Sequence, residues 1–541
     1  MEGYMIYTAQ NCVTEFYFTS GKKHRDPFNE VELDLVVTDP DGIEQRVPAY
    51  WAGEQTWTVR YSSPKVGLHS YRTVCSDASD ADLHGREGTI KVVPYKGKNP
   101  LLRHGPIRVA ADRRHFEHVD GTPFFWLGDT WWMGLCKRLR WPDDFQTLTA
   151  DRVSKGFSVI QIVAGLYPDM PPFDERGANE AGFPWDKDYK RINPHYFDMA
   201  DLRIQWLVRS GLVPCIVGCW GYFLEFTSVE VLKKHWRNLL ARYGAYPVVW
   251  CMAGEATMLY YLSPALGDPE KSKQAVARAR AGWTEITRYL RSIDPYHRPI
   301  TLHPSSTARE CVDDVSVMDF DMLQTGHGGR DSLPNTVNRV VESLGKEPKM
   351  PVVVGEVCYE GIGGQSWEEV QRFAFWASIL SGAGGHTYGA NGIWQVNTRE
   401  APYGASPHGM AWGHTPWEDA YRLPGSTQLG IAKRLLERYP WWKFEPHPEW
   451  TEPHSKPENR FLPYAAGIPR SVRVIFMPLA WWTPPLVKGI EPGTSYRAFL
   501  FDVLDGSQTD LGTVQPDAKG NWQPPRIPVW RDWVLVLENK A

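Results

Sequence analysis

The sequence predicts a (β/α)8 TIM barrel flanked by an N-terminal β-sandwich and a small C-terminal β-domain. Strand-like and helix-like stretches alternate through the middle of the chain, whereas both ends show strands separated by turns. Such alternation favours a parallel sheet, and eight units over roughly 310 residues fit a barrel with inserted loops. Two buried-strand patterns, Pro247–Glu255 and Pro351–Glu356, each end in a small residue followed by glutamate.

Length and composition bound the architecture and exclude several classes of partner. The 541 residues are too many for one hydrophobic core and predict two to four domains. A net charge of −4, from 59 basic and 63 acidic residues, gives no electrostatic footprint for nucleic acid or a membrane surface. No apolar run is long enough for a transmembrane helix. We therefore expect no nucleic-acid and no membrane partner.

The first residues and the cysteines indicate the compartment. Met1–Cys12 contains neither a basic n-region nor an apolar h-region, so we expect a cytoplasmic protein, or an exported one if a leader has been removed. The eight cysteines include no Cys-x-x-Cys pair and no Cys/His cluster with zinc spacing. This pattern predicts reduced thiols.

Residues 1–96 are predicted to form the N-terminal β-sandwich. The expected strands are Val31–Thr38, Trp57–Tyr61, Gly67–Cys75 and Gly88–Val93. Their spacing is typical of a sandwich, and Asp39–Gly42 supplies a turn in which proline presets φ and glycine takes a positive φ. No catalytic constellation occurs here. A structural module is the favoured interpretation, and a contribution to the rim of the cleft stays open.

Residues 97–444 are predicted to form the barrel, entered through a hairpin at Ile107–Ala110 and His115–Val119. The expected strands are Phe124–Leu127, Ser158–Val163, Val213–Val217, Val248–Met252, Pro299–Leu302, Val317–Leu323, Val352–Val354 and Gly385–Tyr388. The expected helices are Asp143–Lys155, Tyr196–Ser210, Val229–Tyr243, Lys271–Ser292, Pro334–Gly345, Trp367–Leu380 and Thr427–Tyr439. The connection Ser305–Ser316 is too short for a full helix.

Two further segments complete the chain. Leu166–Pro194 is a long loop rich in Pro, Gly, Asp and aromatic residues, and its aromatic content argues for an ordered wall of the cleft. Residues 445–541 are predicted to form the C-terminal β-domain, behind a Pro-rich boundary. Its expected strands are Ser471–Phe476, Tyr496–Asp502 and Trp533–Leu537. A stabilising cap is favoured there over sugar binding.

Polar and aromatic side chains gather at the predicted strand ends and not at the strand starts. Active sites of TIM barrels are built at the carboxyl ends of the strands, so these side chains are candidates for a site. Flat aromatic faces suit sugar rings, although they also fill cores. The candidate substrate-binding residues are Asp129, Trp131, Trp132, Gln161, Trp220, His303, His327, Tyr359, Glu360, Tyr388, Asn391 and Trp394.

Glu255 and Glu356 are the candidate catalytic residues. They end strands four and seven, which lie on opposite sides of a barrel bore, so their side chains are placed to bracket one bond. Glycoside hydrolysis needs two such carboxylates, about 5–5.5 Å apart for retention and about 6.5–9.5 Å apart for inversion. Taken singly, each glutamate is equally well explained as a salt bridge or a helix cap. Glu360 is a rival to Glu356.

Two other functions stay open. A metal-dependent hydrolase is suggested by His303, His327 and His386 at three strand ends. Against it, strand one lacks a His-x-His pair and strand four lacks a carboxylate-bridging lysine, so we expect no metal and no cofactor. The other alternative is a non-catalytic glycan-binding protein with a degenerate barrel site.

Four segments resemble the apiosidase-like glycoside hydrolases, a TIM-barrel group that includes glycoside hydrolase family 140. They are Phe125–Trp132 (FWLGDTWW), Lys155–Val163 (KGFSVIQIV), Val248–Glu255 (VVWCMAGE) and Val353–Gly361 (VVGEVCYEG). The two end domains are similar to the β-sandwich that often precedes these barrels and the β-domain that often follows them. The resemblance implies a retaining pair of carboxylates, with Glu356 as nucleophile and Glu255 as acid/base.

One departure from the family limits what the resemblance implies. Many relatives carry Gly-Gly-Asp where this chain has Ala253-Gly254-Glu255, and many broader TIM-barrel glycosidases carry Asn before the glutamate. Apiosidase activity is therefore not carried over. We expect a glycosidase that acts on a plant or microbial oligosaccharide, exo-acting and retaining, with carbohydrate as its partner. Homo-oligomer formation stays open.

Overall fold

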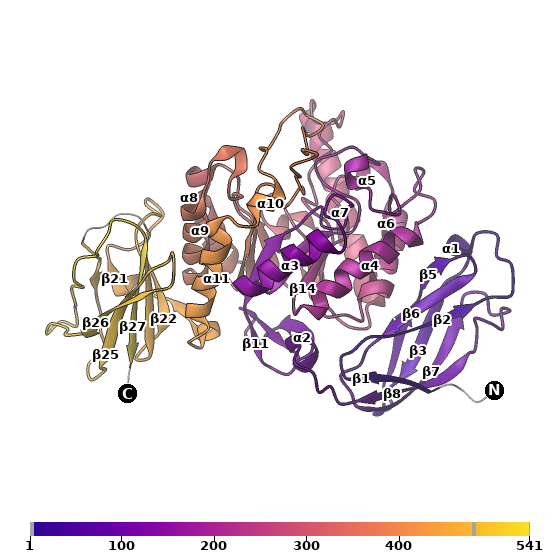
Figure 1. Ribbon diagram of the computed structural model, residues 1–541, viewed down its shortest axis with the longest axis horizontal. Helices are drawn as coiled ribbons and strands as arrows, with labels where there is room; N and C mark the ends of the chain where they lie inside the picture. Colours follow the sequence, from indigo (N-terminus) through magenta and orange to yellow (C-terminus); the bar gives the residue numbers. More distant parts are fainter. Residues whose placement is uncertain (1–4, 479–482, 540–541) are drawn as a thin grey trace.

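The computed structural model describes residues 5–478 and 483–539, and its centre is a barrel with β-structure on either side (Figure 1). Eight parallel strands have the order β16-β15-β14-β13-β12-β19-β18-β17. They are β12 (Trp126–Thr130), β13 (Val159–Val163), β14 (Val213–Val217), β15 (Val249–Cys251), β16 (Ile300–Thr301), β17 (Asp321–Gln324), β18 (Val352–Glu356) and β19 (Gly385–Tyr388). Between β16 and β17 the Asp319 amide donates to the Ile300 carbonyl (2.8 Å). The predicted barrel is confirmed.

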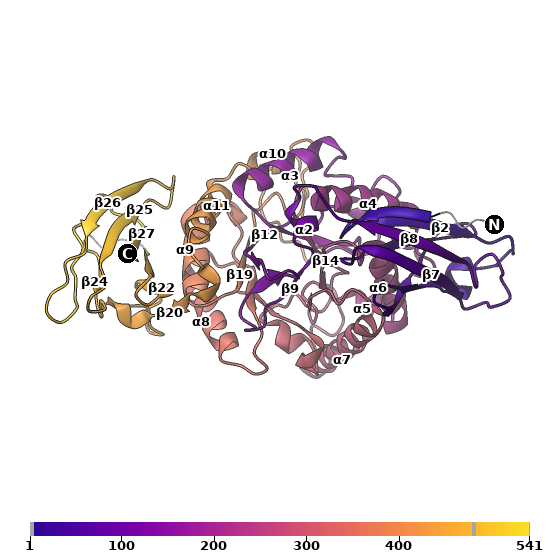
Figure 2. The same cartoon turned by 90° about the horizontal axis from the view of Figure 1, so that it is seen from below.

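Helices surround this sheet on its outer side (Figures 1 and 2). They are α3 (Asp143–Lys155), α4 (Pro194–Arg209), α6 (Val229–Tyr243), α7 (Pro269–Ile293), α8 (Leu333–Leu344), α9 (Glu368–Leu380) and α11 (Pro424–Leu436). Several begin at a residue whose side chain accepts a hydrogen bond from the first turn, such as Ser228 before α6 and Asp268 before α7. The connection after β16 contains only short 3-10 turns at Ala308–Cys311 and Val315–Val317, as its length predicts.

Two predicted strand boundaries are wrong. The run Phe124–Leu127 divides between two sheets, because β11 (Pro123–Phe124) pairs with the lead-in hairpin and the barrel strand begins only at Trp126. The run Val317–Leu323 begins too early, because the Asp314 side chain accepts from the Ser316 amide (3.0 Å) and starts a 3-10 turn. In both cases an apolar run continues through a change of backbone conformation.

The lead-in hairpin closes the lower end of the barrel. Strands β9 (Ile107–Val109), β10 (Phe116–His118) and β11 form a three-stranded sheet that lies across this end when the molecule is seen from below (Figure 2). The ring of Phe116 packs against Trp126 and Phe320, with centroids 5.2 and 5.1 Å apart. The opposite end, where the strands finish, is therefore the end available for a site.

The N-terminal region is a sandwich of two sheets. One sheet has the order β1-β8-β7-β3-β4 and the other the order β2-β6-β5. Their bounds are β1 (Met5–Ala9), β2 (Thr14–Thr19), β3 (Leu33–Thr38), β4 (Glu44–Pro48), β5 (Tyr50–Gly53), β6 (Thr56–Tyr61), β7 (Gly67–Cys75) and β8 (Glu87–Val93). Alternate apolar residues such as Leu33, Leu35 and Val37 face the shared core.

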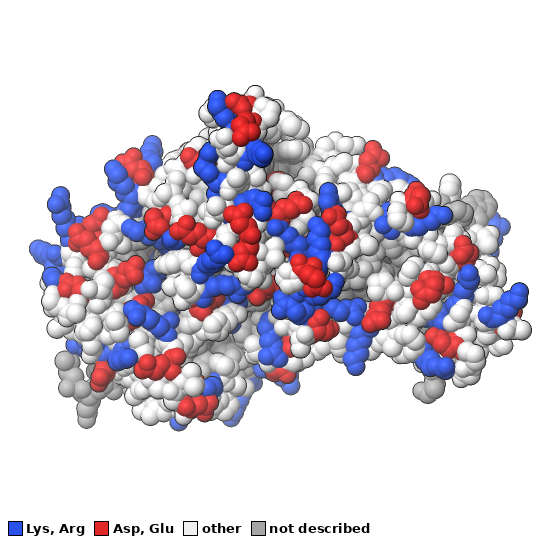
Figure 3. Space-filling model, turned by 180° about the vertical axis from the view of Figure 1, so that it is seen from behind, with Lys and Arg blue, Asp and Glu red and all other residues white. Residues whose placement is uncertain are grey.

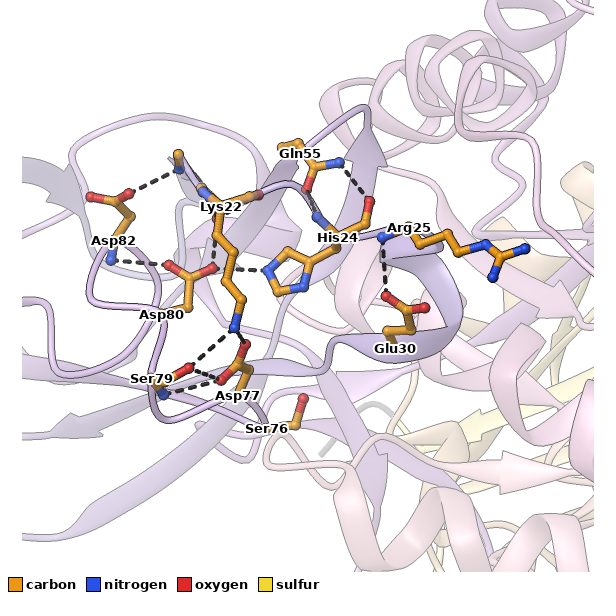
Figure 4. A network of polar contacts seen from close by, with 12 residues as sticks. Lys22, His24, Arg25, Glu30, Gln55, Ser76, Asp77, Ser79, Asp80 and Asp82 are labelled. Atoms are coloured by element: carbon orange, nitrogen blue, oxygen red, sulfur yellow. Dashed lines mark hydrogen bonds and ion pairs between the residues drawn. The ribbon is translucent and has the colours of Figure 1, made fainter.

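Polar contacts hold the sandwich together and attach it to the barrel. Within it, Asp80 accepts hydrogen bonds from Ser20 (2.6 Å) and His24 (2.9 Å), and Lys22 pairs with Asp77 beside them (Figure 4). At the barrel, buried Arg60 of β6 pairs with Asp201 of α4 (2.6 Å).

The C-terminal region has a six-stranded antiparallel sheet with the order β20-β22-β23-β27-β25-β26. Its strands are β20 (Glu445–Pro446), β22 (Tyr464–Ile468), β23 (Val472–Met477), β25 (Tyr496–Phe501), β26 (Gln508–Thr513) and β27 (Trp533–Asn539). Phe476 stacks on Trp376 of α9, with centroids 6.0 Å apart, so this sheet packs directly on the barrel's helical layer. The boundaries 1–96, 97–444 and 445–541 stay predictions about folding units.

Charges of both signs are mixed on one face of the molecule. On the face shown in Figure 3, Lys and Arg are interspersed with Asp and Glu and do not gather into a patch of one sign. In the described ranges, no helix combines the length and the apolar character that a bilayer span requires.

Candidate active site

A cavity of about 230 Å³ lies at the carboxyl ends of the barrel strands. Residues that follow β12, β13, β14, β15, β17, β18 and β19 all contribute to its lining. The lining residues are Trp132, Pro168, Asp169, Trp220, Glu255, Met258, Tyr261, Gln324, His327, Glu356, Tyr359, Ile362, Trp394, His408 and Trp412. Six of these side chains are tryptophan or tyrosine rings, so a large part of the wall is flat and apolar.

Glu356 ends β18, and its carboxylate is held by two histidines. His327 Nε2 lies 2.7 Å from Oε1, and His303 Nε2 lies 3.1 Å from Oε2. Burial opposes ionisation of this carboxyl, but the contacts with His303 and His327 outweigh it and hold the pKa of Glu356 at about 2. Glu356 is therefore ionised throughout the physiological pH range.

His327 provides the positive charge opposite Glu356. Burial disfavours the protonated ring, but contacts with Cys358 and Glu356 more than compensate and raise the pKa of His327 to about 10. The imidazolium and the carboxylate therefore form an ion pair at neutral pH.

His303 connects the two glutamates. The Glu255 amide donates to His303 Nδ1 (3.4 Å), so Nδ1 acts as an acceptor and the ring proton lies on Nε2, which faces Glu356. His303 is itself fully buried beneath the cavity and does not line it. The Glu255 backbone amide thus sets the tautomer of His303, and the protonated Nε2 lies next to the Glu356 carboxylate.

Glu255 has the opposite electrostatic surroundings. Trp220 Nε1 donates to Oε2 and Gln324 Nε2 donates to Oε1, both at 3.2 Å. Both donors are neutral. Burial raises the pKa of Glu255, and the negative charge of Glu356 raises it further. The two strand-end glutamates therefore have pKa values shifted in opposite directions.

The backbone at Glu255 is strained and well held. Its φ is 39°, a left-handed value that few residues with a side chain adopt. Hydrogen bonds continue the sheet on either side, from Gly254 N–H to the Cys219 carbonyl (2.9 Å) and from Ala256 N–H to the His303 carbonyl (3.0 Å). Strain of this kind persists where surrounding contacts hold it, and it is common at functional sites.

The glycine at position 254 has a local steric reason. A Cβ atom at this position would overlap the indole ring of Trp220, which packs directly on the Gly254 backbone. The same indole donates to Glu255. Gly254, where many broader TIM-barrel glycosidases carry asparagine, therefore leaves room for the Trp220 ring. Trp220 in turn positions Glu255 from the end of the neighbouring strand.

Five of the predicted substrate-binding residues line the cavity: Trp132, Trp220, His327, Tyr359 and Trp394. Trp132 Nε1 donates to the Tyr359 hydroxyl (2.9 Å), and Tyr359 stacks on Trp394 with a centroid distance of 5.9 Å. These contacts fix the rings in one arrangement, so they form a rigid apolar surface.

Six predicted residues lie away from the cavity. Asp129 and Trp131 turn outward, where Asp129 pairs with Arg152 of α3 (2.6 Å) and accepts from Trp131 Nε1 (2.7 Å). Successive side chains of a strand point to opposite faces, and Asp129 and Tyr388 occupy outward positions. Tyr388 donates to Glu360, which also accepts from the Gly425 amide (3.0 Å). Glu360 therefore lies between the barrel sheet and the surrounding helices, where its carboxylate is hydrogen-bonded by Tyr388 and Gly425.

The other two of the six are also hydrogen-bonded within the protein, although Asn391 Nδ2 has no partner among the described residues. Gln161 points into the barrel and donates to the Gly355 carbonyl (3.0 Å), while Asn391 accepts from Gln395 (3.3 Å). His386 packs against Phe375, with centroids 5.5 Å apart, and does not join His303 and His327. Among the residues placed by the structure, no group of three potential ligands is arranged to hold a metal ion.

Sequence reasoning missed several lining residues. Gln324 ends β17, so its strand-end position was a usable signal. Pro168 and Asp169 belong to the long loop that was predicted as a cleft wall. Tyr261, His408 and Trp412 come from irregular segments far from any strand end in the sequence, and no periodic pattern marks them.

Comparisons with known proteins give two family matches. The model described as "Apiosidase-like, catalytic domain" matches residues 110–443, and a domain of unknown function, DUF5060, matches residues 10–76. A comparison with curated proteins finds no match.

Solved structures share the fold. One titled "Glycoside hydrolase" is 23% identical, with a TM-score of 0.67, covering 82% of this chain and 99% of that one. A glycoside hydrolase family 5 protein from Bacteroides vulgatus is also 23% identical, with a TM-score of 0.67 and coverage of 82% and 96%. A third structure, from the same organism, is 16% identical with a TM-score of 0.70, and the match covers 99% of both chains. The whole three-part arrangement therefore recurs.

Proposed function

Because the chain belongs to the apiosidase-like catalytic-domain family, we propose that it hydrolyses an O-glycosidic bond with retention, using Glu356 as nucleophile and Glu255 as acid/base. The fold and the family support glycosidase activity in general. The assignment of the two roles is supported by the electrostatics of the cavity.

The single observation that carries this proposal is the difference between the neighbours of the two carboxylates: two imidazole nitrogens face Glu356, whereas two neutral N–H groups donate to Glu255. A nucleophile must be ionised, and the pKa of Glu356 is about 2 because two histidines face its carboxylate. A general acid must hold a proton at working pH, and burial together with the charge of Glu356 raises the pKa of Glu255. Paired carboxylates whose surroundings separate their pKa values mark the acid and the base of a reaction.

The chemistry would proceed in two steps. A Glu356 oxygen attacks the anomeric carbon as the bond to the leaving oxygen breaks, and Glu255 gives its proton to that oxygen. The resulting glycosyl ester is then cleaved by water, which loses a proton to Glu255 as its oxygen bonds to the anomeric carbon. The first step leaves Glu255 deprotonated, so it can accept the proton from water in the second step, which restores both glutamates. The product keeps the anomeric configuration of the substrate.

The cavity supports action at the end of a glycan. Its volume of about 230 Å³ is below the range of about 300–1,000 Å³ that is usual for pockets that hold larger ligands. Such a space suits one sugar unit. Its lining includes Pro168 and Asp169 from the loop after β13, and His408 and Trp412 from the segment after β19.

The test is a hydrolysis screen on aryl glycosides, furanosides included, with Glu255→Gln and Glu356→Gln in parallel. We expect one glycoside to be cleaved by the wild type, and both variants to lose several orders of magnitude in kcat/KM. NMR of the first-formed product should show the substrate's anomeric configuration. Inverted product, or full activity in Glu356→Gln, would refute the assigned roles.

A further inference from the structure

The cavity contains a third carboxylate, Asp169, which the proposed mechanism does not use. Asp169 lies in the loop after β13 and is only 3% exposed. Its backbone is fixed from two sides, because its amide donates to the Tyr261 hydroxyl (3.1 Å) and its carbonyl accepts from the Tyr403 hydroxyl (3.3 Å). Its φ of 60° is left-handed. The side chain is thus held in one direction at the cavity wall.

The carboxylate of Asp169 is incompletely satisfied. Its Oδ2 atom is buried and has no hydrogen-bond partner within the described part of the chain. Burial raises the pKa of Asp169 to about 7, and contacts with Trp412 and Ser406 offset only part of this effect. Buried polar atoms in proteins nearly always have a partner, so an acceptor left open beside a cavity indicates a donor on the ligand. A sugar hydroxyl is such a donor.

The charges around the cavity restrict which sugar can enter. Among the described residues that line it, three are carboxylic acids and none is lysine or arginine. The two histidines are the only potential cations there, and His327 is already paired with Glu356. Arg176 acts electrostatically on Asp169, but it does not line the cavity and is already paired with Asp174 (2.8 Å). A substrate carboxylate would therefore meet the negative charge of Asp169 and no lysine or arginine of the lining, which is an effective way to reject a competing ligand.

We propose that Asp169 is a specificity-determining residue, which accepts a hydrogen bond from a hydroxyl of a neutral sugar and repels sugars that carry a carboxylate. The inference rests on the proposed function for its ligand class, because it takes the cavity to be the glycosyl-binding site. It assigns Asp169 no part in bond cleavage.

The test measures binding, so it does not depend on turnover. Calorimetric titrations would compare D-glucose, D-galactose and D-mannose, together with L-arabinose and D-apiose, against D-glucuronate, D-galacturonate and D-mannuronate. For the wild type at pH 8 we expect a neutral sugar to bind at least tenfold more tightly than every uronate. Binding by none of the neutral sugars, or equal binding of the uronates, would overturn the proposal.

The variant that isolates the side chain is Asp169→Asn, since asparagine tolerates a positive φ and keeps the shape of the carboxylate. We expect the neutral sugar to bind about 10- to 100-fold more weakly, because the charged acceptor is replaced by a neutral amide, in which an NH2 donor takes the place of one oxygen. The preference over uronates should shrink at the same time. If Asp169 had only a structural role, the variant would bind the neutral sugar and the uronates more weakly by the same factor. An unchanged ratio of the two affinities would therefore contradict the proposal.

Two controls complete the design. Asp188→Asn makes the same chemical change at an exposed position of the same loop and should leave both affinities unaltered. If Asp169→Asn does not fold, the ratio is measured instead in Asp169→Ser, with the same expectation. A wild type that binds with this selectivity but cleaves no glycoside would refute the proposed function and leave the role of Asp169 standing.

Discussion

At the scale of single residues, two glutamates at equivalent strand ends differ because their neighbours differ. Glu356 faces the imidazole nitrogens of His303 and His327, whereas Glu255 faces two neutral N–H groups from Trp220 and Gln324. The negative charge of the first then works against ionisation of the second. Because they interact, the two groups titrate as a pair, and a pH profile reports the pair.

His327→Gln removes the charged partner of Glu356 and keeps a side chain that can donate. The proposed mechanism needs Glu356 ionised. In the wild type, kcat/KM should therefore fall on the acid side only as pH drops through the Glu356 pKa of about 2. Without the imidazolium this pKa should rise, and the acid limb of kcat/KM should move to higher pH. The loss of one charge-assisted hydrogen bond predicts a fall in kcat/KM of about 10- to 100-fold at neutral pH. An unmoved acid limb would show that His327 does not tune Glu356.

Glu356→Gln tests the coupling from the other side. The proposed mechanism needs Glu255 protonated, so activity of the wild type declines as pH rises through the raised pKa of Glu255. Removing the charge of Glu356 takes away one cause of that rise. We expect the pKa of Glu255, measured by carboxyl-carbon NMR in Glu356→Gln, to fall below its wild-type value. An equal or higher value would contradict the electrostatic account.

At the scale of elements, the end of β15 and the segment after β14 act together. Trp220 lies over Gly254 and also donates a hydrogen bond to Glu255. The Trp220 ring fits there because residue 254 has no side chain, and its position fixes that of the Glu255 carboxylate. The bridge between Trp220 and Gly254 extends the β14–β15 pairing beyond both strands. The register of two adjacent strands therefore decides where this glutamate points.

Gly254→Ala should disturb this arrangement. The added methyl group would overlap the Trp220 ring, and overpacking of a buried site costs about 1–3 kcal/mol. We expect a lower Tm and a fall in kcat/KM, because Trp220 must move away from Glu255. Gly267→Ala is the matched control, since nothing lies within 4 Å of a Cβ there and its φ is not left-handed. Equal Tm values for the two variants would rule out the steric explanation.

The strand ends also show what could be predicted from sequence. Glu255 and Glu356 were placed correctly at strand ends because an apolar run followed by a small residue marks that position locally. Asp129 and Trp132, three residues apart, could not be told apart, because which side of a strand faces the bore depends on its register with β13 and β19. Asp169 and Trp412 approach through loops, whose conformation depends on tertiary contacts.

At the scale of the whole molecule, the barrel carries a β-structure on each side, and each is joined by buried ions as well as apolar contacts (Figure 1). The N-terminal side uses Arg60 with Asp201, and the C-terminal side uses Arg372 of α9 with Asp532. A buried ion pair adds little net stability over an apolar pair, but removal of one partner leaves a charge without compensation. We therefore interpret these two ion pairs as contacts that fix the orientation of the N-terminal and C-terminal β-structures on the barrel.

Arg372→Met tests this view on the C-terminal side. Arg372 Nε lies 2.6 Å from Asp532, and the two side chains are 7% and 5% exposed. Because Asp532 would stay buried without its cation, we expect the free energy of unfolding in urea to fall by about 3–5 kcal/mol. The double variant Arg372→Met/Asp532→Leu should recover most of that loss, since no buried charge is left.

Lys190→Met is the control in an exposed ion pair, and it should lower the free energy of unfolding by about 0–1 kcal/mol. Neither Arg372 nor Asp532 lines the cavity, so kcat/KM at 25 °C should stay unchanged in both variants. A double variant as unstable as the single one would show that the pair stabilises the interface and does more than specify it.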